Sequence, residues 1–117
     1  MPSRVVFLNA LPLNAFSISE GEEVLLRVAK ESYESIRGLV KDHAEAGIPM
    51  ECYIRHSSTV ELLNKLLGLN LKPSSGLYGY REGDKIIVVT LKKPIRGEEV
   101  EVKPEDIEFY IVTLEED

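Results

Sequence analysis

The run Arg4–Leu8 is the feature that most limits how this chain can fold. Its residues, Arg-Val-Val-Phe-Leu, are apolar almost without interruption. A strand with one solvated face alternates apolar and polar residues, whereas a strand covered on both faces is a nearly continuous apolar run. The run therefore predicts a central strand covered on both faces, which is typical of an α/β fold.

Further segments have the apolar content or the alternation that is typical of strands. The strongest of them is Lys85-Ile-Ile-Val-Val-Thr-Leu91. Between Leu71 and Arg81 two interpretations stay open, because Leu77, Tyr78 and Tyr80 would suit an edge strand while nearby proline and glycine residues favour a loop. The predicted strands after the first are Glu22–Ala29, Met50–Ile54, Lys85–Leu91 and Ile107–Leu114.

Two segments have helical spacing. The first opens at Ser32 and stops at Gly47, and it carries His43 in its last turn, where we expect a solvated side chain favoured by the helix dipole. The second ends at Gly68, and Ser58 followed three residues later by a glutamate predicts a capping box at its start. Its leucines, at positions 62, 63, 66 and 67, predict one apolar helical face.

Together these elements predict one domain over residues 1–117. We expect a mixed β-sheet of about five strands flanked by helices, since 117 residues suit a single core. A net charge of −6 argues against binding to duplex DNA, which requires an extended basic face. No apolar run is long enough to cross a membrane and the start lacks a signal-peptide pattern, so we expect a cytoplasmic protein with no membrane partner.

Metal and cofactor motifs are missing from the sequence, so we expect neither a metal site nor a cofactor. There is no Walker loop, dinucleotide-binding glycine pattern or HExxH motif, and the two histidines lie far apart. Cys52 is the single cysteine and has apolar neighbours, which predicts a buried, inert thiol.

The corner Arg55-His56-Ser57-Ser58 is the first candidate site. It places a guanidinium, an imidazole and two hydroxyls just before a predicted helix start. Free backbone N–H groups and the positive end of the helix dipole make such a start suitable for phosphate, and a histidine beside a bound phosphodiester can act as a general acid. From the local pattern alone, a histidine that only caps or fills is the favoured alternative.

Two loops supply further candidates. Asn9 and Asn14 bound the loop after the first strand, where ligands collect in open α/β sheets, although asparagines also stabilise turns. The basic loop Lys92–Gly97 follows the strongest strand, and it suits either an anionic ligand or a solvated surface.

The order of these segments resembles the STIV B116-like family of archaeal-virus, phage and host proteins, which includes the viral anti-CRISPR type III ring nucleases and their cellular homologues. The resemblance extends over almost the whole chain and rests on a loop and a helix in combination, together with the late strands. The segments that carry it are Asn9-Ala-Leu-Pro-Leu-Asn14, Ile54-Arg-His-Ser-Ser-Thr-Val-Glu-Leu-Leu-Asn-Lys-Leu-Leu-Gly68, Val88-Val-Thr-Leu-Lys-Lys and Glu108-Phe-Tyr-Ile-Val.

The resemblance implies a homodimer whose shared cleft binds a cyclic oligoadenylate, above all cyclic tetra-adenylate, and cleaves it without a metal. A ribose 2′-hydroxyl would attack the neighbouring phosphate, and His56 would protonate the departing oxygen as the catalytic residue. Such a protein would switch off or evade type III CRISPR signalling, in the host cytoplasm if it is viral. The implied ligand-binding residues are Asn9, Asn14, Arg55, Ser57, Ser58, Lys93 and Arg96, with Glu98 and Glu99 as candidate supporting residues.

The chain also departs from the family pattern. Arg55 stands where the family has glycine before its histidine. In the family a loop that closes over the ligand brings an arginine and a glutamate; the stretch Lys92–Glu99 corresponds to this closing loop, and Pro94 falls near the position of its arginine. Ser74-Ser75-Gly76 aligns with an Asn-Arg-Val stretch that contacts phosphate in relatives. These departures keep two other functions open: a dimer that sequesters the cyclic nucleotide without cleaving it, and a structural or protein-interaction dimer.

Overall fold

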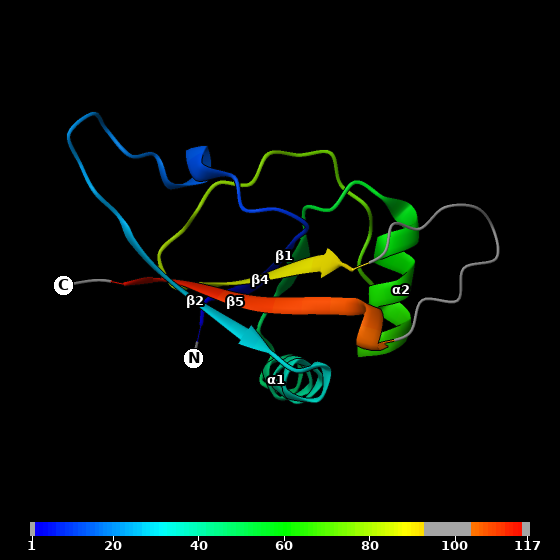
Figure 1. The fold of residues 1–117 in the computed structure, drawn as a ribbon. Helices are drawn as coiled ribbons and strands as arrows, with labels where there is room; N and C mark the ends of the chain where they lie inside the picture. Colours follow the sequence, from blue (N-terminus) through cyan, green and yellow to red (C-terminus); the bar gives the residue numbers. More distant parts are fainter. Residues whose placement is uncertain (1, 93–103, 116–117) are drawn as a thin grey trace.

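Five strands form a single mixed sheet in the order β2-β5-β4-β1-β3 (Figure 1). The computed structural model describes residues 2–92 and 104–115. β1 is parallel to both β3 and β4, whereas β5 is antiparallel to both β4 and β2. The predicted mixed sheet is therefore confirmed. The strands are β1 (Arg4–Leu8), β2 (Leu25–Glu31), β3 (Met50–Cys52), β4 (Asp84–Leu91) and β5 (Ile107–Glu115).

β1 is buried along its whole length, as its continuous apolar run predicts. It lies between β3 and β4, so both of its backbone edges are hydrogen-bonded. The middle position of the sheet belongs to β4, which lies between β1 and β5. Two of the predicted strands differ by more than one residue at an end: β2 runs from Leu25 to Glu31 rather than from Glu22 to Ala29, and β3 ends at Cys52 rather than Ile54.

Helix α1 (Tyr33–Glu45) begins and ends where the sequence predicts. The Ser32 side chain accepts a hydrogen bond from the Ser35 backbone N–H at 3.1 Å, which caps the first turn. The prediction of a solvated His43 is wrong, because this side chain is only 8% exposed. Its Nδ1 lies 2.8 Å from the Leu39 carbonyl oxygen, and its Nε2 is buried without a partner in the part of the chain that the structure describes.

Helix α2 (Ser57–Leu67) begins earlier than predicted, and the capping box at Ser58 is wrong. His56 is the N-cap residue, it makes no side-chain capping bond, and its carbonyl accepts from the Val60 N–H at 3.1 Å. Thr59 and Val60 lie in the first turn and are both buried. The predicted end is confirmed, since Gly68 adopts the left-handed conformation with φ of 68°.

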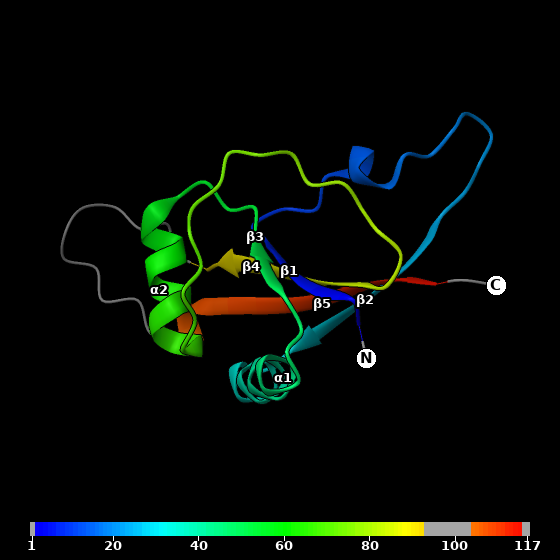
Figure 2. The same ribbon diagram turned by 180° about the vertical axis from the view of Figure 1, so that it is seen from behind.

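The two faces of the sheet are covered differently. Figures 1 and 2 show α1 and α2 on one side, and the 3₁₀ helix η1 (Leu13–Phe16) with the segment 70–81 on the other. The helical side holds the larger core, around Phe7, Leu63 and Phe109. The segment 70–81 contains no strand, so the loop alternative holds there.

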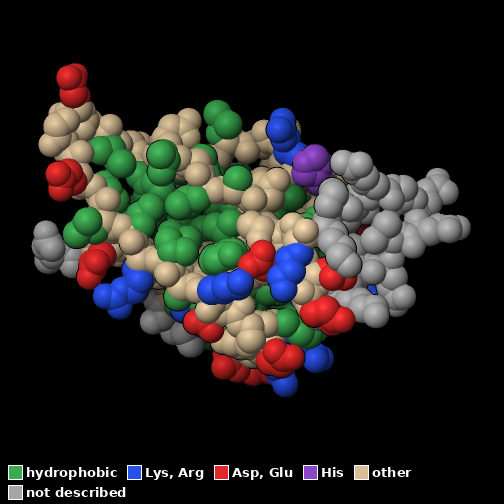
Figure 3. All heavy atoms as spheres, viewed as in Figure 1, with side chains coloured by type: hydrophobic (Ala, Val, Ile, Leu, Met, Phe, Trp, Pro, Cys, Tyr) green, Lys and Arg blue, Asp and Glu red, His purple; other side chains and the backbone are tan. Residues whose placement is uncertain are grey.

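A smaller core lies under η1 and the segment 70–81. Its buried members are Val6, Leu8, Ala15, Tyr78, Ile86, Val88 and Val112. Val28 pairs with Val112 across β2 and β5 and so shares this face, yet it is 57% exposed. Figure 3 shows apolar side chains at the surface between η1 and β5. This face of the sheet is therefore only partly covered.

Candidate functional site

The carboxyl ends of the three parallel strands β1, β3 and β4 lie at the same end of the sheet. Asn9 follows β1, Tyr53 follows β3 and Lys92 follows β4. The register pairs Phe7 with Cys52 and Leu8 with Val88, so β1 and β3 end close to the same level while β4 continues to Leu91. Ligands of open α/β sheets bind outside such ends, because the connecting loops leave a crevice there.

A cavity of about 480 Å³ lies at the carboxyl ends of these strands. Three of the predicted ligand-binding residues, Asn9, Asn14 and Arg55, line it together. Its volume falls within the range of roughly 300–1,000 Å³ that is usual for small-molecule sites. We call it the Asn loop pocket. Its other lining residues belong to the end of β1, the loop before η1, the turn after β3 and the segment 70–81: Leu8, Ala10, Leu11, Pro12, Tyr53, Ser75, Gly76, Leu77 and Tyr78.

The polar groups of this pocket are available to a ligand. Asn9, Asn14 and Arg55 are exposed, and within residues 2–92 and 104–115 their side chains make no hydrogen bond or ion pair. Two carboxamides can each donate and accept, and the guanidinium carries a fixed positive charge. The pocket therefore combines hydrogen-bonding groups with a site for an anion.

His56 lies next to the pocket but does not line it. It follows Arg55 directly, it is exposed, and it forms the N-cap of α2. Ser57 and Ser58 are also exposed, at the first two positions of the helix, where backbone N–H groups have no partner within the helix. The structure thus separates the predicted site into a pocket and an adjoining helix start.

The predicted residues of the closing loop lie outside the described residues. This applies to Lys93, Arg96, Glu98 and Glu99, and to the departure at Pro94.

The segment 70–81 forms one wall of the pocket although it has no regular structure. Asn64 on α2 holds its start, donating from Nδ2 to the Leu71 carbonyl at 2.8 Å and accepting from the Leu71 N–H at 2.7 Å. Farther along, the Ser74 N–H donates to the Ile54 carbonyl at 2.9 Å, and the Tyr80 N–H donates to the Ala15 carbonyl at 2.8 Å. These bonds fix the coil against α2 and η1.

A buried ion pair anchors the same wall. Arg4, at the start of β1, donates from Nε and Nη2 to the two carboxylate oxygens of Asp84, at 2.7 and 2.9 Å. Arg4 Nη2 also donates to the Gly79 carbonyl at 3.0 Å, and Arg4 pairs with Glu51. The Tyr78 hydroxyl donates to Asp84 Oδ2 at 2.5 Å, which ties a pocket residue to this pair. We call Arg4, Asp84 and Tyr78 the clamp.

The clamp shifts the pKa of each of its members. Burial acts to raise the pKa of Asp84, but hydrogen bonds from Arg4, Tyr78 and the Arg81 N–H outweigh it, so the pKa lies below the usual value for aspartate. The hydrogen bond to Asp84 raises the pKa of Arg4. Burial, followed by the bond to the Asp84 carboxylate, raises the pKa of Tyr78, so this phenol stays protonated.

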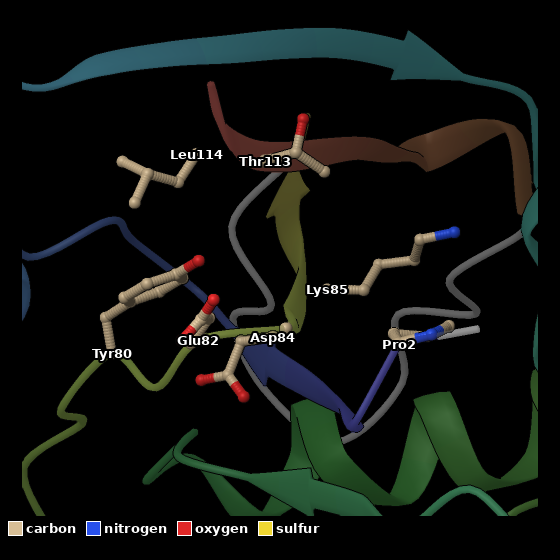
Figure 4. A pocket seen from close by; sticks show the side chains of 8 residues that line it. Pro2, Tyr80, Glu82, Asp84, Lys85, Thr113 and Leu114 are labelled. Atoms are coloured by element: carbon tan, nitrogen blue, oxygen red, sulfur yellow. The ribbon is translucent and has the colours of Figure 1, made fainter. Parts of the chain in front are cut away.

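A second cavity, of about 490 Å³, lies at the opposite end of the parallel strands. Its lining includes four residues at and just before the start of β4: Glu82, Gly83, Asp84 and Lys85. Tyr80 and Lys85 lie on opposite sides of it (Figure 4). None of the predicted site residues lines it, and the Asp84 carboxylate is already engaged in the clamp. The Asn loop pocket is the stronger candidate, because three of the predicted ligand-binding residues line it and none lines this cavity.

Sequence reasoning missed the aromatic part of the Asn loop pocket. Tyr53 and Tyr78 line it, with ring centroids 5.3 Å apart and planes inclined at 60°. The position of Tyr53 directly after β3 was a usable signal, since it places the side chain at the same strand edge as Asn9. Tyr78 carried no such signal, because it lies in a coil without periodicity.

The remaining candidates have simple surroundings. Cys52 is half-buried and burial raises the pKa of its thiol, although the Ile54 N–H that donates to Sγ acts in the other direction. Among residues 2–92 and 104–115, no group of three or more histidine, cysteine or acidic side chains could hold a metal ion. Neither helix of this same part of the chain is long and apolar enough to cross a membrane.

Comparisons with known proteins agree with the fold. The sequence model of the STIV B116-like family matches residues 8–114. The structure of B116 of Sulfolobus turreted icosahedral virus superimposes with a TM-score of 0.73 at 21% sequence identity, covering 93% of this chain and 97% of B116. No curated protein sequence matches significantly.

Proposed function

The chain belongs to the STIV B116-like family, and on this premise we propose that it is a metal-independent ring nuclease that binds and cleaves a cyclic oligoadenylate, above all cyclic tetra-adenylate. Cleavage would switch off or evade type III CRISPR signalling. The observation that carries the proposal is the Asn loop pocket, in which Asn9, Asn14 and Arg55 meet directly beside the exposed His56 at the start of α2.

The proposed reaction requires only groups of the ligand and of the protein, together with water as the proton acceptor. A ribose 2′-hydroxyl attacks the adjacent phosphorus and gives its proton to water, and a bond forms between its oxygen and phosphorus. The bond from phosphorus to the 5′-oxygen breaks, and the His56 imidazolium donates its proton to that oxygen. The products end in a 2′,3′-cyclic phosphate and a 5′-hydroxyl.

The start of α2 suits the phosphate in this reaction. Ser57 and Ser58 occupy its first turn and are exposed, at the positive end of the helix dipole, where backbone N–H groups have no partner within the helix. Negative charge that builds on the phosphate oxygens in the transition state is stabilised by such donors. Arg55 adds a cation at the junction of this helix start and the pocket.

A homodimer is part of the proposal. On the side of the sheet opposite the helices, Val28 of β2, Leu13 of η1 and Leu77 of the segment 70–81 are exposed, at 57%, 71% and 91%. A second copy on this open face would bury these side chains and bring two pockets to one two-fold cleft, in which a ring with internal symmetry meets equivalent residues.

A second candidate function is sequestration of the cyclic nucleotide without cleavage. It is favoured by the position of His56 beside the pocket rather than in its lining. Incubation of the full-length protein with cyclic tetra-adenylate and with rings of other sizes, with and without a chelator, followed by chromatography, decides between the two. Linear products formed in the presence of chelator support the nuclease, and intact ring that co-elutes with the protein supports sequestration. No product and no co-elution would reject both.

A further inference from the structure

The strands β4 and β5 part at the amino end of β4. The register between them stops at Ile86 and Val112, although β4 begins at Asp84 and β5 continues to Glu115. Beyond this point β4 stays paired with β1, and β5 stays paired with β2. The second cavity, of about 490 Å³, lies between the diverging ends, since residues of both strands line it. We call it the fork cavity.

The helical side of the fork cavity holds a lysine without a partner. Ile86 and Val112 belong to the smaller core, so the adjoining Lys85 and Thr113 point to the opposite face, which the helices cover. Lys85 and Thr113 are half-buried, and their side chains make no hydrogen bond or ion pair within residues 2–92 and 104–115. An ammonium and a hydroxyl that can both donate are therefore available to an anion.

The other side of the fork cavity is apolar. Leu114 follows Thr113 along β5, so it points to the face that carries η1. Tyr80 packs there against Phe16 of η1, with ring centroids 5.4 Å apart. Tyr80 and Lys85 lie on opposite sides of the cavity (Figure 4). A molecule in the fork would meet an aromatic ring at one end and a positive charge at the other.

The acidic residues in the lining do not cancel this charge. The Asp84 carboxylate is engaged by the Arg4 guanidinium through two hydrogen bonds. Glu82 forms no ion pair with Lys85 in the part of the chain that the structure describes, and it is exposed whereas Lys85 is half-buried. Water screens an exposed charge more than a half-buried one, so the field inside the fork favours an anion.

The wall formed by residues 81–84 is fixed without a ligand. The Ser3 N–H donates to the Gly83 carbonyl at 2.9 Å, and the Asp84 N–H donates to the Arg81 carbonyl at 3.0 Å. The Arg81 N–H donates in turn to Asp84 Oδ2 at 3.0 Å. A site that is already formed loses little free energy to ordering when a molecule enters.

We propose that the fork cavity binds a small amphipathic carboxylate, whose flat apolar part packs on Tyr80 and Leu114 and whose charged group meets Lys85 and Thr113. Its volume lies within the range that is usual for small-molecule sites. The fork cavity shares no lining residue with the Asn loop pocket and lies at the opposite end of the parallel strands. This site does not depend on the proposed nuclease reaction.

The test uses isotope-labelled full-length protein and phenylpropionate as the probe, followed by NMR and calorimetry. We expect saturable shifts of the backbone amide signals of Lys85, Thr113 and Leu114. Phenylpropanol has the ring without the charge, and it should bind at least about 10-fold more weakly because the hydrogen bond to a charged group is lost. Hexanoate has the charge without the ring, and it should bind at least about 3-fold more weakly.

Three substitutions test the assigned charges. Lys85→Met keeps most of the stem but removes the ammonium, and it should weaken phenylpropionate binding at least about 10-fold. Glu82→Gln removes a like charge and should strengthen binding by up to about 3-fold. Arg55→Met is the matched control, because it removes an unpaired cation from the Asn loop pocket and should leave the affinity unchanged. Thermal unfolding checks that each variant is folded.

Four results would overturn the proposal. These are no saturable shift at phenylpropionate concentrations up to about 10 mM, equal affinity for phenylpropanol, unchanged affinity in a folded Lys85→Met, and shifts at Asn9 with loss of binding in Arg55→Met. The last result would place the probe in the Asn loop pocket instead. If Lys85→Met does not fold, the comparison with phenylpropanol and the sign of the Glu82→Gln effect decide, and weaker binding by Glu82→Gln would overturn the proposal.

Discussion

The Tyr78 hydroxyl donates a 2.5 Å hydrogen bond to Asp84 Oδ2, and Tyr78 also lines the Asn loop pocket. Asp84 begins β4 and its partner Arg4 begins β1, so the buried charges lie at the amino ends of the strands while the pocket lies at their carboxyl ends. The clamp therefore connects the stability of the sheet to the position of one pocket wall. Disturbing the charges should affect both.

Asp84→Asn should lower the free energy of unfolding by about 3 kcal/mol. The substitution leaves the Arg4 guanidinium buried with an incomplete set of partners, which costs more than the loss of a solvated pair. Urea unfolding measures the change. Glu51→Gln is the control, because the Glu51 side chain is 41% exposed and its pair with Arg4 should contribute under about 1 kcal/mol. Equal effects of the two substitutions would contradict the central role of Asp84.

The clamp should also make stability depend on acid pH. The pKa of Asp84 is lowered in the folded protein, so the unfolded chain binds the proton more readily. This contribution to stability is complete above the ordinary aspartate pKa of about 4 and is lost as the pH falls through the depressed value. Urea unfolding between pH 6 and pH 3 should show a steeper decline for the unsubstituted protein than for Asp84→Asn. Parallel declines would mean that other carboxylates dominate.

His56→Ala should reduce cleavage of cyclic tetra-adenylate by about 10²-fold or more, which is the usual contribution of a general acid. Binding should change little, because His56 does not line the pocket. Single-turnover cleavage measures the first quantity and calorimetry the second. Unchanged cleavage would reject the histidine mechanism, and loss of binding would mean that His56 contacts the ligand in the ground state.

Two serine substitutions distinguish the observed helix starts from the pattern in the sequence. Ser32→Ala removes the bond to the Ser35 N–H and should cost about 1 kcal/mol of stability. Ser58→Ala removes no capping bond, since α2 begins at Ser57 with His56 as its N-cap, so its stability should stay within about 0.5 kcal/mol. Thermal unfolding of both variants provides the comparison. A large loss in Ser58→Ala would restore the capping box.

Two glycine substitutions should have opposite signs. Gly38 lies inside α1 and a Cβ there would meet nothing within 4 Å, so Gly38→Ala should stabilise the protein by about 0.5–1 kcal/mol. Gly68 has a φ of 68°, which side chains other than glycine adopt at a cost, so Gly68→Ala should destabilise it by about 1 kcal/mol or more. Chemical denaturation of both variants measures the signs, and a stabilising Gly68→Ala would contradict the left-handed end of α2.

Local patterns predicted the elements whose limits depend on their own residues. Arg4–Leu8 is a strand because its continuous apolar run is buried inside a layered sheet, and α1 begins at Tyr33 because the Ser32 hydroxyl caps its first turn. The limits of β2 depend instead on β5, which pairs with it from Leu25 to Glu31. His43 is buried because of the tertiary position of its helix, which no local signal contains.

The candidate site was predictable to the extent that it follows the ends of strands. Asn9 and Arg55 come soon after parallel neighbours, so topology alone brings them together. The wall around Tyr78 was not predictable, because a coil without periodicity is positioned by distant partners such as Asn64 and Asp84. The start of α2 was also predicted wrongly. The Ser-x-x-Glu pattern at Ser58 predicts a cap there, whereas the structure has His56 as the N-cap and buries Thr59 and Val60 in the first turn.

The strand order has a consequence for synthesis on the ribosome. β5 is the last strand of the sheet to be made, yet it lies between β2 and β4 and pairs with both. Until residues 107–115 emerge, β2 has no neighbour in the sheet, and β4 pairs with β1 on one edge while its other edge is unpaired. The nascent chain therefore has unpaired backbone edges on β2 and β4, and β5 must insert between these two strands rather than add to an outer edge of the sheet.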